Sequence, residues 1–210
     1  MTITVKKIAV IGVLSAVVIV LGMTGLGFII FPSGAAITIL QTPVIMGAIL
    51  EGPFAGFFIG LLFGIFSIVQ SALMAATPID MAFVTYPFIA IIPRILIGPA
   101  AWLFYALITG QLLKKKATAL NPVLESTAIV IAAIIGSLVN TVLVLSGFGI
   151  LQLFSWKVII PVAITNGSLE AACSAVLTFL VVTVWKHIPR GSGKSRISKK
   201  FEESASQSKK

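Results

Sequence analysis

Six apolar runs, separated by short polar or proline-rich stretches, constrain the fold of this chain more than any other feature. A bilayer core of ~30 Å needs about 20 apolar residues per helix, and backbone at that depth must satisfy its own hydrogen bonds. The runs therefore predict membrane-spanning helices. These cover residues 8–28, 37–50, 53–74, 86–113, 124–146 and 156–185. Because the second run is short, we expect the segment before it to be a partly folded or re-entrant loop.

The composition excludes a soluble globular domain. Hydrophobic residues make up 58% of the 210 positions and charged residues only 10%. The mean hydropathy of the chain is +1.13. Such values are typical of integral membrane proteins.

The positive charges predict the orientation of the helices. Thirteen of the fifteen Lys and Arg residues precede the first predicted helix, follow the fourth, or lie from residue 186 onward. With six helices these positions share one side, whereas Lys157 lies on the other side and Arg94 within the membrane. Because short loops rich in Lys and Arg stay cytoplasmic, we expect a multi-pass protein of the cell membrane with both termini in the cytoplasm. The net charge of +9 follows from this distribution and does not indicate nucleic-acid binding.

The domain organisation is simple. We expect residues 1–187 to form a single six-helix transmembrane domain. Residues 188–210 are rich in serine, mixed in charge and poor in apolar side chains, which is typical of a disordered basic cytoplasmic tail.

The chain lacks the residues that an intramembrane enzyme needs. Its one histidine, His187, lies in a predicted cytoplasmic segment, and Glu170 is the one carboxylate that we expect at depth within the membrane. A zinc site, a serine–histidine pair and a pair of catalytic carboxylates are therefore excluded, and the sequence holds no nucleotide-binding lysine loop. We expect a binding or transport protein without a cofactor or metal.

Small residues indicate how two of the helices pack. Gly56, Gly60 and Gly64 recur every fourth residue on the third helix, which favours close packing against another helix of the same chain. Ala9, Gly12 and Ala16 form a small-residue face on the first helix. This second face fits either internal packing or the docking of another membrane protein.

Polar residues within the predicted helices are few and lie mostly in the outer half. Asn166 and Glu170 are four residues apart and share a helix face. These polar residues come from five of the predicted helices. The candidates for substrate binding are Gln41, Gln70, Tyr86, Arg94, Asn140, Asn166 and Glu170. Their convergence predicts an all-α integral membrane protein with six transmembrane helices and a loop-capped cavity on the outer side.

Two segments resemble a known family. ITILQTPVIMGAILEGPFAGFFIGLLFGIFS and YPFIAIIPRILIGPAAWLFYALI, on a chain with basic ends and a small-residue motif on the first helix, resemble the substrate-specific S component of energy-coupling factor (ECF) vitamin transporters. The resemblance extends from about residue 6 to residue 185. It implies a protein that captures a vitamin or related micronutrient from outside the cell.

The resemblance also implies partners. S components associate with a transmembrane coupling protein and two cytoplasmic ATPases, and small residues on the first helix contact the coupling protein. Gly12 and Ala16 match that motif, with glycine in place of the commoner first alanine. A stand-alone secondary transporter or channel component is the alternative, although the two halves of the chain show no internal repeat.

Arg94 bears on the identity of the substrate. A guanidinium within the membrane costs at least ~2.5 kcal/mol and needs a partner, and it can hold a carboxylate through two parallel hydrogen bonds. Pantothenate carries one carboxylate, an amide and hydroxyl groups, so it is the substrate that we expect. Alternatively, Arg94 pairs with Glu170 within the protein, and the two residues are then structural.

Overall fold

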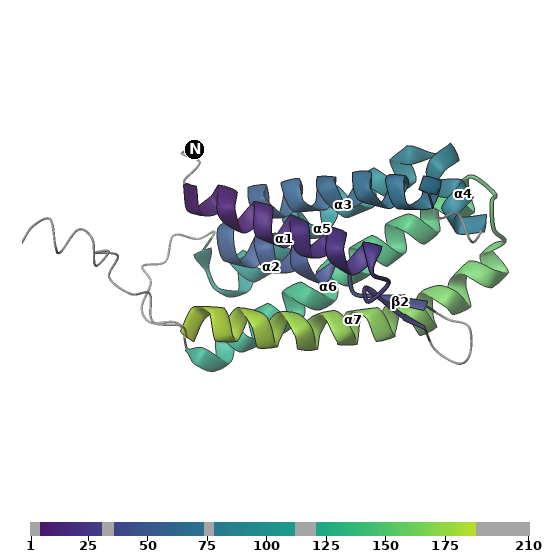
Figure 1. Cartoon of the computed structure of the whole chain (residues 1–210). Coiled ribbons are helices and arrows are strands. Elements are labelled where there is room, and N and C mark those ends of the chain that lie inside the picture. Colours follow the sequence, from purple (N-terminus) through teal and green to yellow (C-terminus); the bar gives the residue numbers. More distant parts are fainter. Residues whose placement is uncertain (1–4, 31–35, 74–77, 112–120, 188–210) are drawn as a thin grey trace, which may run out of the picture.

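The computed structural model describes residues 5–30, 36–73, 78–111 and 121–187, which form helices and one small hairpin (Figure 1). Five helices of this described part are long and apolar enough to cross a membrane, which confirms a helical membrane protein. The elements are α1 (Val5–Met23), β1 (Phe28–Ile30), β2 (Ala36–Thr38), α2 (Thr42–Glu51), α3 (Pro53–Leu73), α4 (Pro78–Thr85), α5 (Pro87–Ile108), α6 (Pro122–Ile150) and α7 (Trp156–His187).

The long helices run along one another and define two ends of the bundle (Figure 1). Val5 and His187, the first and last described residues, lie at the same end, which we call the terminal end. An ion pair of 2.5 Å between Lys6 Nζ and Glu51 Oε1 joins α1 to the end of α2 there. The other end holds α4 and the turn between α6 and α7, and we call it the α4 end. The predicted tail, 188–210, lies outside the described residues.

Two predicted helix boundaries were wrong. The first helix was expected to reach residue 28, but α1 ends at Met23, because Gly25 takes a left-handed φ of +74° and Phe28 begins β1. The second helix was expected to begin at residue 37, but Ala36–Thr38 is β2, paired antiparallel with β1, and α2 begins at Thr42. The short helix α4 was not predicted. The other predicted ranges overlap the observed helices over most of their length.

Proline marks the start of four helices. The first residues of α3, α4, α5 and α6 are Pro53, Pro78, Pro87 and Pro122. Proline suits this position because its fixed φ is helical and the missing N–H would have no partner within the helix. The same residue type that breaks the apolar runs in the sequence therefore sets where the helices begin.

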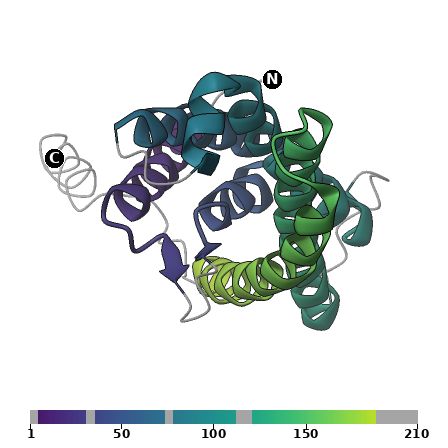
Figure 2. The ribbon, with the colours of Figure 1, turned by 90° about the vertical axis from the view of Figure 1, so that its right-hand side faces the viewer.

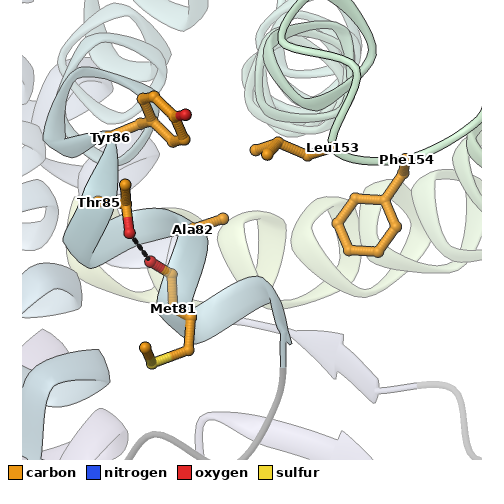
Figure 3. A pocket seen from close by; sticks show the side chains of 6 residues that line it. All are labelled: Met81, Ala82, Thr85, Tyr86, Leu153 and Phe154. Carbon is orange, nitrogen blue, oxygen red and sulfur yellow. Dashed lines mark hydrogen bonds between the residues drawn. The ribbon is translucent and has the colours of Figure 1, made fainter.

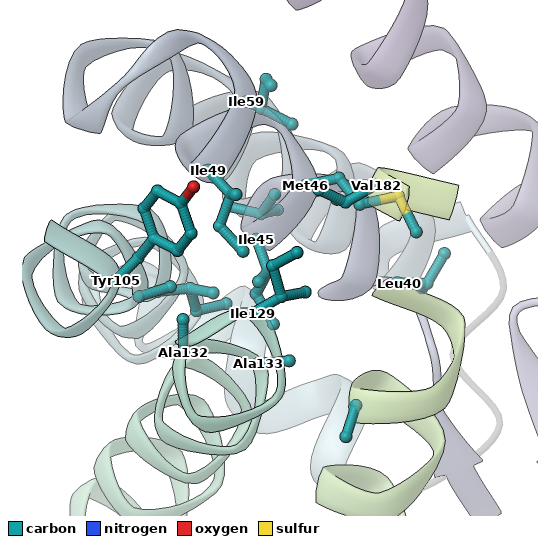
Figure 4. Close-up of a cluster of buried hydrophobic side chains, with 14 of the residues drawn as sticks. Leu40, Ile45, Met46, Ile49, Ile59, Tyr105, Ile129, Ala132, Ala133 and Val182 are labelled. Atoms are coloured by element: carbon teal, nitrogen blue, oxygen red, sulfur yellow. The ribbon is translucent and has the colours of Figure 1, made fainter. Parts of the chain in front are cut away.

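Helix α2 lies in the centre of the bundle (Figure 2). It contacts all five long helices, and its residues from Thr42 to Ile49 are all buried. A helix that is apolar all round is stable only when other elements surround it. Ile45 and Ile49 of α2 meet Ile129 and Tyr105 in the main hydrophobic core (Figure 4). At ten residues α2 is about 15 Å long, half the thickness of a bilayer core, so six crossings remain a prediction.

The glycine stripe of α3 packs against α5. A Cβ atom added to Gly60 would lie 2.2 Å from the carbonyl oxygen of Arg94, and one added to Gly56 would lie 2.7 Å from Cα of Gly98. Gly64 is similarly close to Ile91, at 2.9 Å. The stripe therefore brings two backbones together, which confirms internal packing and places α3 directly against the turn of α5 that carries Arg94.

We expect Gly60→Ala to destabilise the isolated protein, because the added methyl group would meet the α5 backbone and not a flexible side chain. Overpacking of this kind typically costs about 1–3 kcal/mol. Gly12→Ala is the matched control, since a Cβ at Gly12 has no atom within 4 Å. Thermal unfolding in detergent measures both variants. Equal stability of the two variants would contradict the tight α3–α5 contact.

Candidate functional site

A buried polar cluster joins α2, α6 and α7. The side-chain nitrogen of Gln41, which is 0% exposed, donates to Ser137 Oγ at 2.7 Å and to Ser174 Oγ at 3.4 Å. Asn140 Nδ2 donates to Gln41 Oε1 at 3.2 Å. Gln41 thus uses both ends of its amide within the protein. Asn140 keeps one buried acceptor, Oδ1, without a hydrogen-bond partner.

Glu170 of α7 fastens the hairpin to this cluster. Its Oε1 accepts a hydrogen bond of 3.1 Å from the backbone N–H of Thr38 at the end of β2. Its Oε2 accepts one of 2.9 Å from the hydroxyl of Thr141 on α6. Both carboxylate oxygens of this buried residue therefore have partners within the protein.

Arg94 replaces a backbone hydrogen bond that is missing from its own helix. Pro93 has no N–H, so the carbonyl of Ile89, four residues earlier, loses its usual backbone donor. Arg94 Nη1 donates to this carbonyl at 2.9 Å. Within a membrane an unpaired carbonyl is costly, so the Pro93–Arg94 pair keeps the helix backbone satisfied.

The rest of the Arg94 side chain lies among aromatic rings. Its guanidinium carbon is 4.6 Å from the ring centre of Phe83 and 5.6 Å from that of Phe63, and the residue is 6% exposed. Its Nε has no hydrogen-bond partner. Arg94 and Glu170 interact electrostatically. They form no ion pair, however: within the described ranges the ion pairs are Lys6–Glu51 and Lys186–Glu125. Arg94 is therefore a buried cation that contacts no anionic side chain of the described residues.

Three other predicted site residues are not hydrogen-bonded to the Gln41 cluster within the described part of the chain. Gln70 donates to the backbone carbonyl of Gly22 at 2.8 Å and so links α3 to the end of α1. Asn166 lies half-buried on α7, one turn before Glu170. Tyr86 stands between α4 and α5, where it lines a pocket at the α4 end.

This pocket has a volume of about 340 Å³, within the range of small-molecule sites. Thr85 and Tyr86 lie on one side and Phe154 on the other (Figure 3). The remaining lining residues are Met81, Ala82 and Leu153. The walls are thus α4, its junction with α5, and the turn between α6 and α7.

The small-residue face of α1 is not covered by other described helices of the chain. Ala9, Gly12 and Ala16 are all exposed, whereas the buried residues of α1, such as Val18 and Gly22, lie on its other side. Gly22 packs against the ring of Phe66, where an added Cβ would lie 2.2 Å away. The face formed by Ala9, Gly12 and Ala16 is therefore available to a partner or to lipid.

Sequence reasoning missed Phe63, Phe83 and Ser174. The two phenylalanines cover Arg94, but their type and spacing match those of lipid-facing aromatics, so no local signal set them apart. Ser174 lies four residues after Glu170 on the same helix face, and this spacing could have revealed it.

A bundle of apolar helices with buried polar groups, an unpaired buried arginine and a pocket at one end defines a membrane protein of the solute-binding or transport class. The model of the family "ECF transporter, substrate-specific component" matches residues 6–182. The chain belongs to this family and is therefore the substrate-specific subunit of a vitamin importer, and the role of the family is not an enzymatic one.

The chain is also similar to a named transporter. It is 27% identical, over 196 residues, to the pantothenic acid transporter PanT of Lactococcus lactis subsp. cremoris (strain MG1363). The match covers 84% of this chain and 92% of the relative. The similarity is thus spread over almost the whole of both proteins.

Proposed function

We propose that this chain binds pantothenate at the outer face of the cell membrane as the substrate-specific subunit of an ECF importer. The observation that carries the choice of substrate is the state of Arg94, a buried guanidinium without a contacting carboxylate. A buried charge is tolerated when it acquires a partner, and a substrate carboxylate would supply one. The pantothenic acid transporter of L. lactis, to which the chain is similar, gives independent support.

Two buried atoms without a hydrogen-bond partner indicate which chemical groups of a substrate would fit the site. Arg94 Nε is a donor that matches a carboxylate, and Asn140 Oδ1 is an acceptor that matches a hydroxyl or amide N–H. Pantothenate has all of these groups. The further contacts that we propose are Gln41, Gln70, Tyr86, Asn166 and Glu170. Gln41 and Glu170 would have to exchange hydrogen bonds that they make within the protein.

We further propose that the importer comprises this chain, a transmembrane coupling protein and two ATPases. Ala9, Gly12 and Ala16 of α1 would contact the coupling protein. The chain would cross the membrane six times with both termini in the cytoplasm, so that the α4 end faces outward. Lys6, Lys7 and Lys186, which lie at the terminal end of the described bundle, support this orientation.

Binding and uptake by the purified chain test this proposal. We expect the chain alone to bind radiolabelled pantothenate with a Kd in the micromolar range or below, that is, about −8 kcal/mol or stronger. Other vitamins should not compete. In liposomes the chain alone should not accumulate pantothenate, and ATP-dependent uptake should begin when the coupling protein and ATPases are added.

The alternative, a stand-alone secondary transporter, makes the opposite prediction for the same liposomes. Uptake by the lone chain, driven by a sodium or proton gradient, would establish that alternative. Tight binding of a different vitamin would retain the class of protein but overturn pantothenate as its substrate.

A further inference from the structure

The Nε donor of Arg94 is closed to a solute, because this atom is buried. The residue as a whole is 6% exposed, and the rings of Phe83 and Phe63 lie over its guanidinium. If a substrate carboxylate reaches Arg94, as the proposed function requires, at least one covering side chain must move. The question is which side chain moves, and from which side the solute approaches.

A column of aromatic rings leads from Arg94 to the pocket at the α4 end. The Phe83 ring lies 5.6 Å from that of Phe148, and the Phe148 ring lies 5.6 Å from that of Phe154. Phe154 lines the pocket, whereas Phe83 and Phe148 are buried. The rings of Phe148 and Phe83 therefore form a series of contacts from Phe154, in the pocket wall, to the guanidinium.

Helix α4 carries both the pocket wall and the cover of Arg94. Ala82 lines the pocket, and the next residue, Phe83, lies against the guanidinium. The helix has only eight residues, and its main backbone contacts are with α3 and α5, its neighbours along the chain. Ala82 and Phe83 of α4 also pack with Phe148 in a second hydrophobic cluster, which is separate from the main core around α2. A shift of this short helix therefore need not disrupt the main core.

We propose that the pocket lined by Met81, Thr85 and Phe154 is the access route for the solute, that Tyr86 lies where this route meets the binding site, and that Phe83 is the gating residue between the pocket and Arg94. The solute first occupies the pocket. It then reaches the guanidinium when the Phe83 ring leaves Phe148. This inference rests on the proposed function, because it assumes that the solute binds at Arg94.

An obstacle on an access route has a distinct kinetic effect. It slows arrival and departure by the same factor, so the equilibrium dissociation constant stays the same. An obstacle within the final binding site instead changes that constant, mostly through the dissociation rate. Rate measurements can therefore distinguish a route from a site.

The first experiment narrows the pocket. Thr85 and Met81 are exposed and line it, so Thr85→Trp and, independently, Met81→Trp place a large ring in the opening. Val84→Trp is the matched control, because Val84 is exposed on the same helix but does not line the pocket. Rapid filtration with radiolabelled pantothenate measures association and dissociation. We expect both rates to fall about fivefold or more in the two pocket variants, with Kd within about twofold of wild type.

The second experiment tests Phe83 as the gating residue. Phe83→Leu shortens the side chain and removes the aromatic column, so pantothenate should associate faster than with wild type. A pocket variant that raises Kd through faster dissociation would overturn the route, because the pocket would then belong to the final site. Unchanged rates in both pocket variants would overturn it too, and would place access elsewhere, such as beside the hairpin. A wild-type chain that does not bind pantothenate would refute the proposed function itself, which separates the two failures.

Discussion

Arg94→Lys is expected to weaken pantothenate binding about tenfold or more, which corresponds to at least about 1.4 kcal/mol. Lysine keeps the positive charge and can still donate to the carbonyl of Ile89 that Pro93 leaves open. It cannot reproduce the planar pair of N–H donors that grips a carboxylate. The variant therefore separates the two roles of the side chain. It keeps the hydrogen bond to the carbonyl of Ile89 but loses the paired hydrogen bonds to the substrate carboxylate.

A neutral ligand supplies the control for this prediction. Pantothenamide lacks the carboxylate, so wild type should bind it more weakly than pantothenate. Arg94→Lys should discriminate much less between the two ligands. This two-by-two comparison isolates the contact between guanidinium and carboxylate from general damage to the site. Equal affinity of wild type for both ligands would eliminate the clamp, and with it the main argument for pantothenate.

Thermal stability tests the competing interpretation, a structural pair of Arg94 and Glu170. Removing one partner of a buried pair typically costs about 3–5 kcal/mol, and removing both recovers much of the loss. Because Glu170 instead accepts hydrogen bonds from Thr38 and Thr141, we expect the effects of Arg94→Gln and Glu170→Gln to couple by less than about 1 kcal/mol. Strong coupling would support the structural pair.

The fold was predictable where it depends on apolar length and on proline. Runs of about 20 apolar residues identified the five long helices. The predicted start of α3 is its proline, and the predicted starts of α5 and α6 lie within two residues of theirs. The hairpin and α4 were not predictable in this way. Each consists of a few apolar residues that would also fit the end of a membrane helix, and tertiary contacts such as that between Phe83 and Phe148 decide their conformation.

The candidate site was predictable only in part, for a related physical reason. Polar residues in an apolar helix stand out, so Gln41, Asn140 and Glu170 could be recognised as buried partners. What the pattern could not provide was the pairing. Gln70 has the same polarity as Gln41, but it donates to the end of α1. Gln41 instead bonds to Ser137 and Asn140 of α6. The elements that pack against each residue, and not its polarity, separate these two glutamines.

The small-residue face of α1 leads to the second prediction with a large expected effect. Replacing Gly12 or Ala16 with tryptophan should abolish ATP-dependent uptake by the assembled importer. Small residues let two helices approach closely, and an indole ring would hold the coupling protein away. Binding of pantothenate by the isolated chain should persist, with Kd within about twofold of wild type, because these residues are exposed and a Cβ at Gly12 meets no atom of this chain within 4 Å.

The control for this prediction is a tryptophan of the same size on another exposed surface. Leu180 of α7 is 53% exposed, so Leu180→Trp adds a comparable ring away from α1. This variant should keep both binding and uptake. If it abolishes uptake as completely as Gly12→Trp does, the loss does not depend on α1 and docking through this face is wrong. If Gly12→Trp abolishes binding as well as uptake, the face serves the folding of the chain itself, and the coupling protein must dock through another helix.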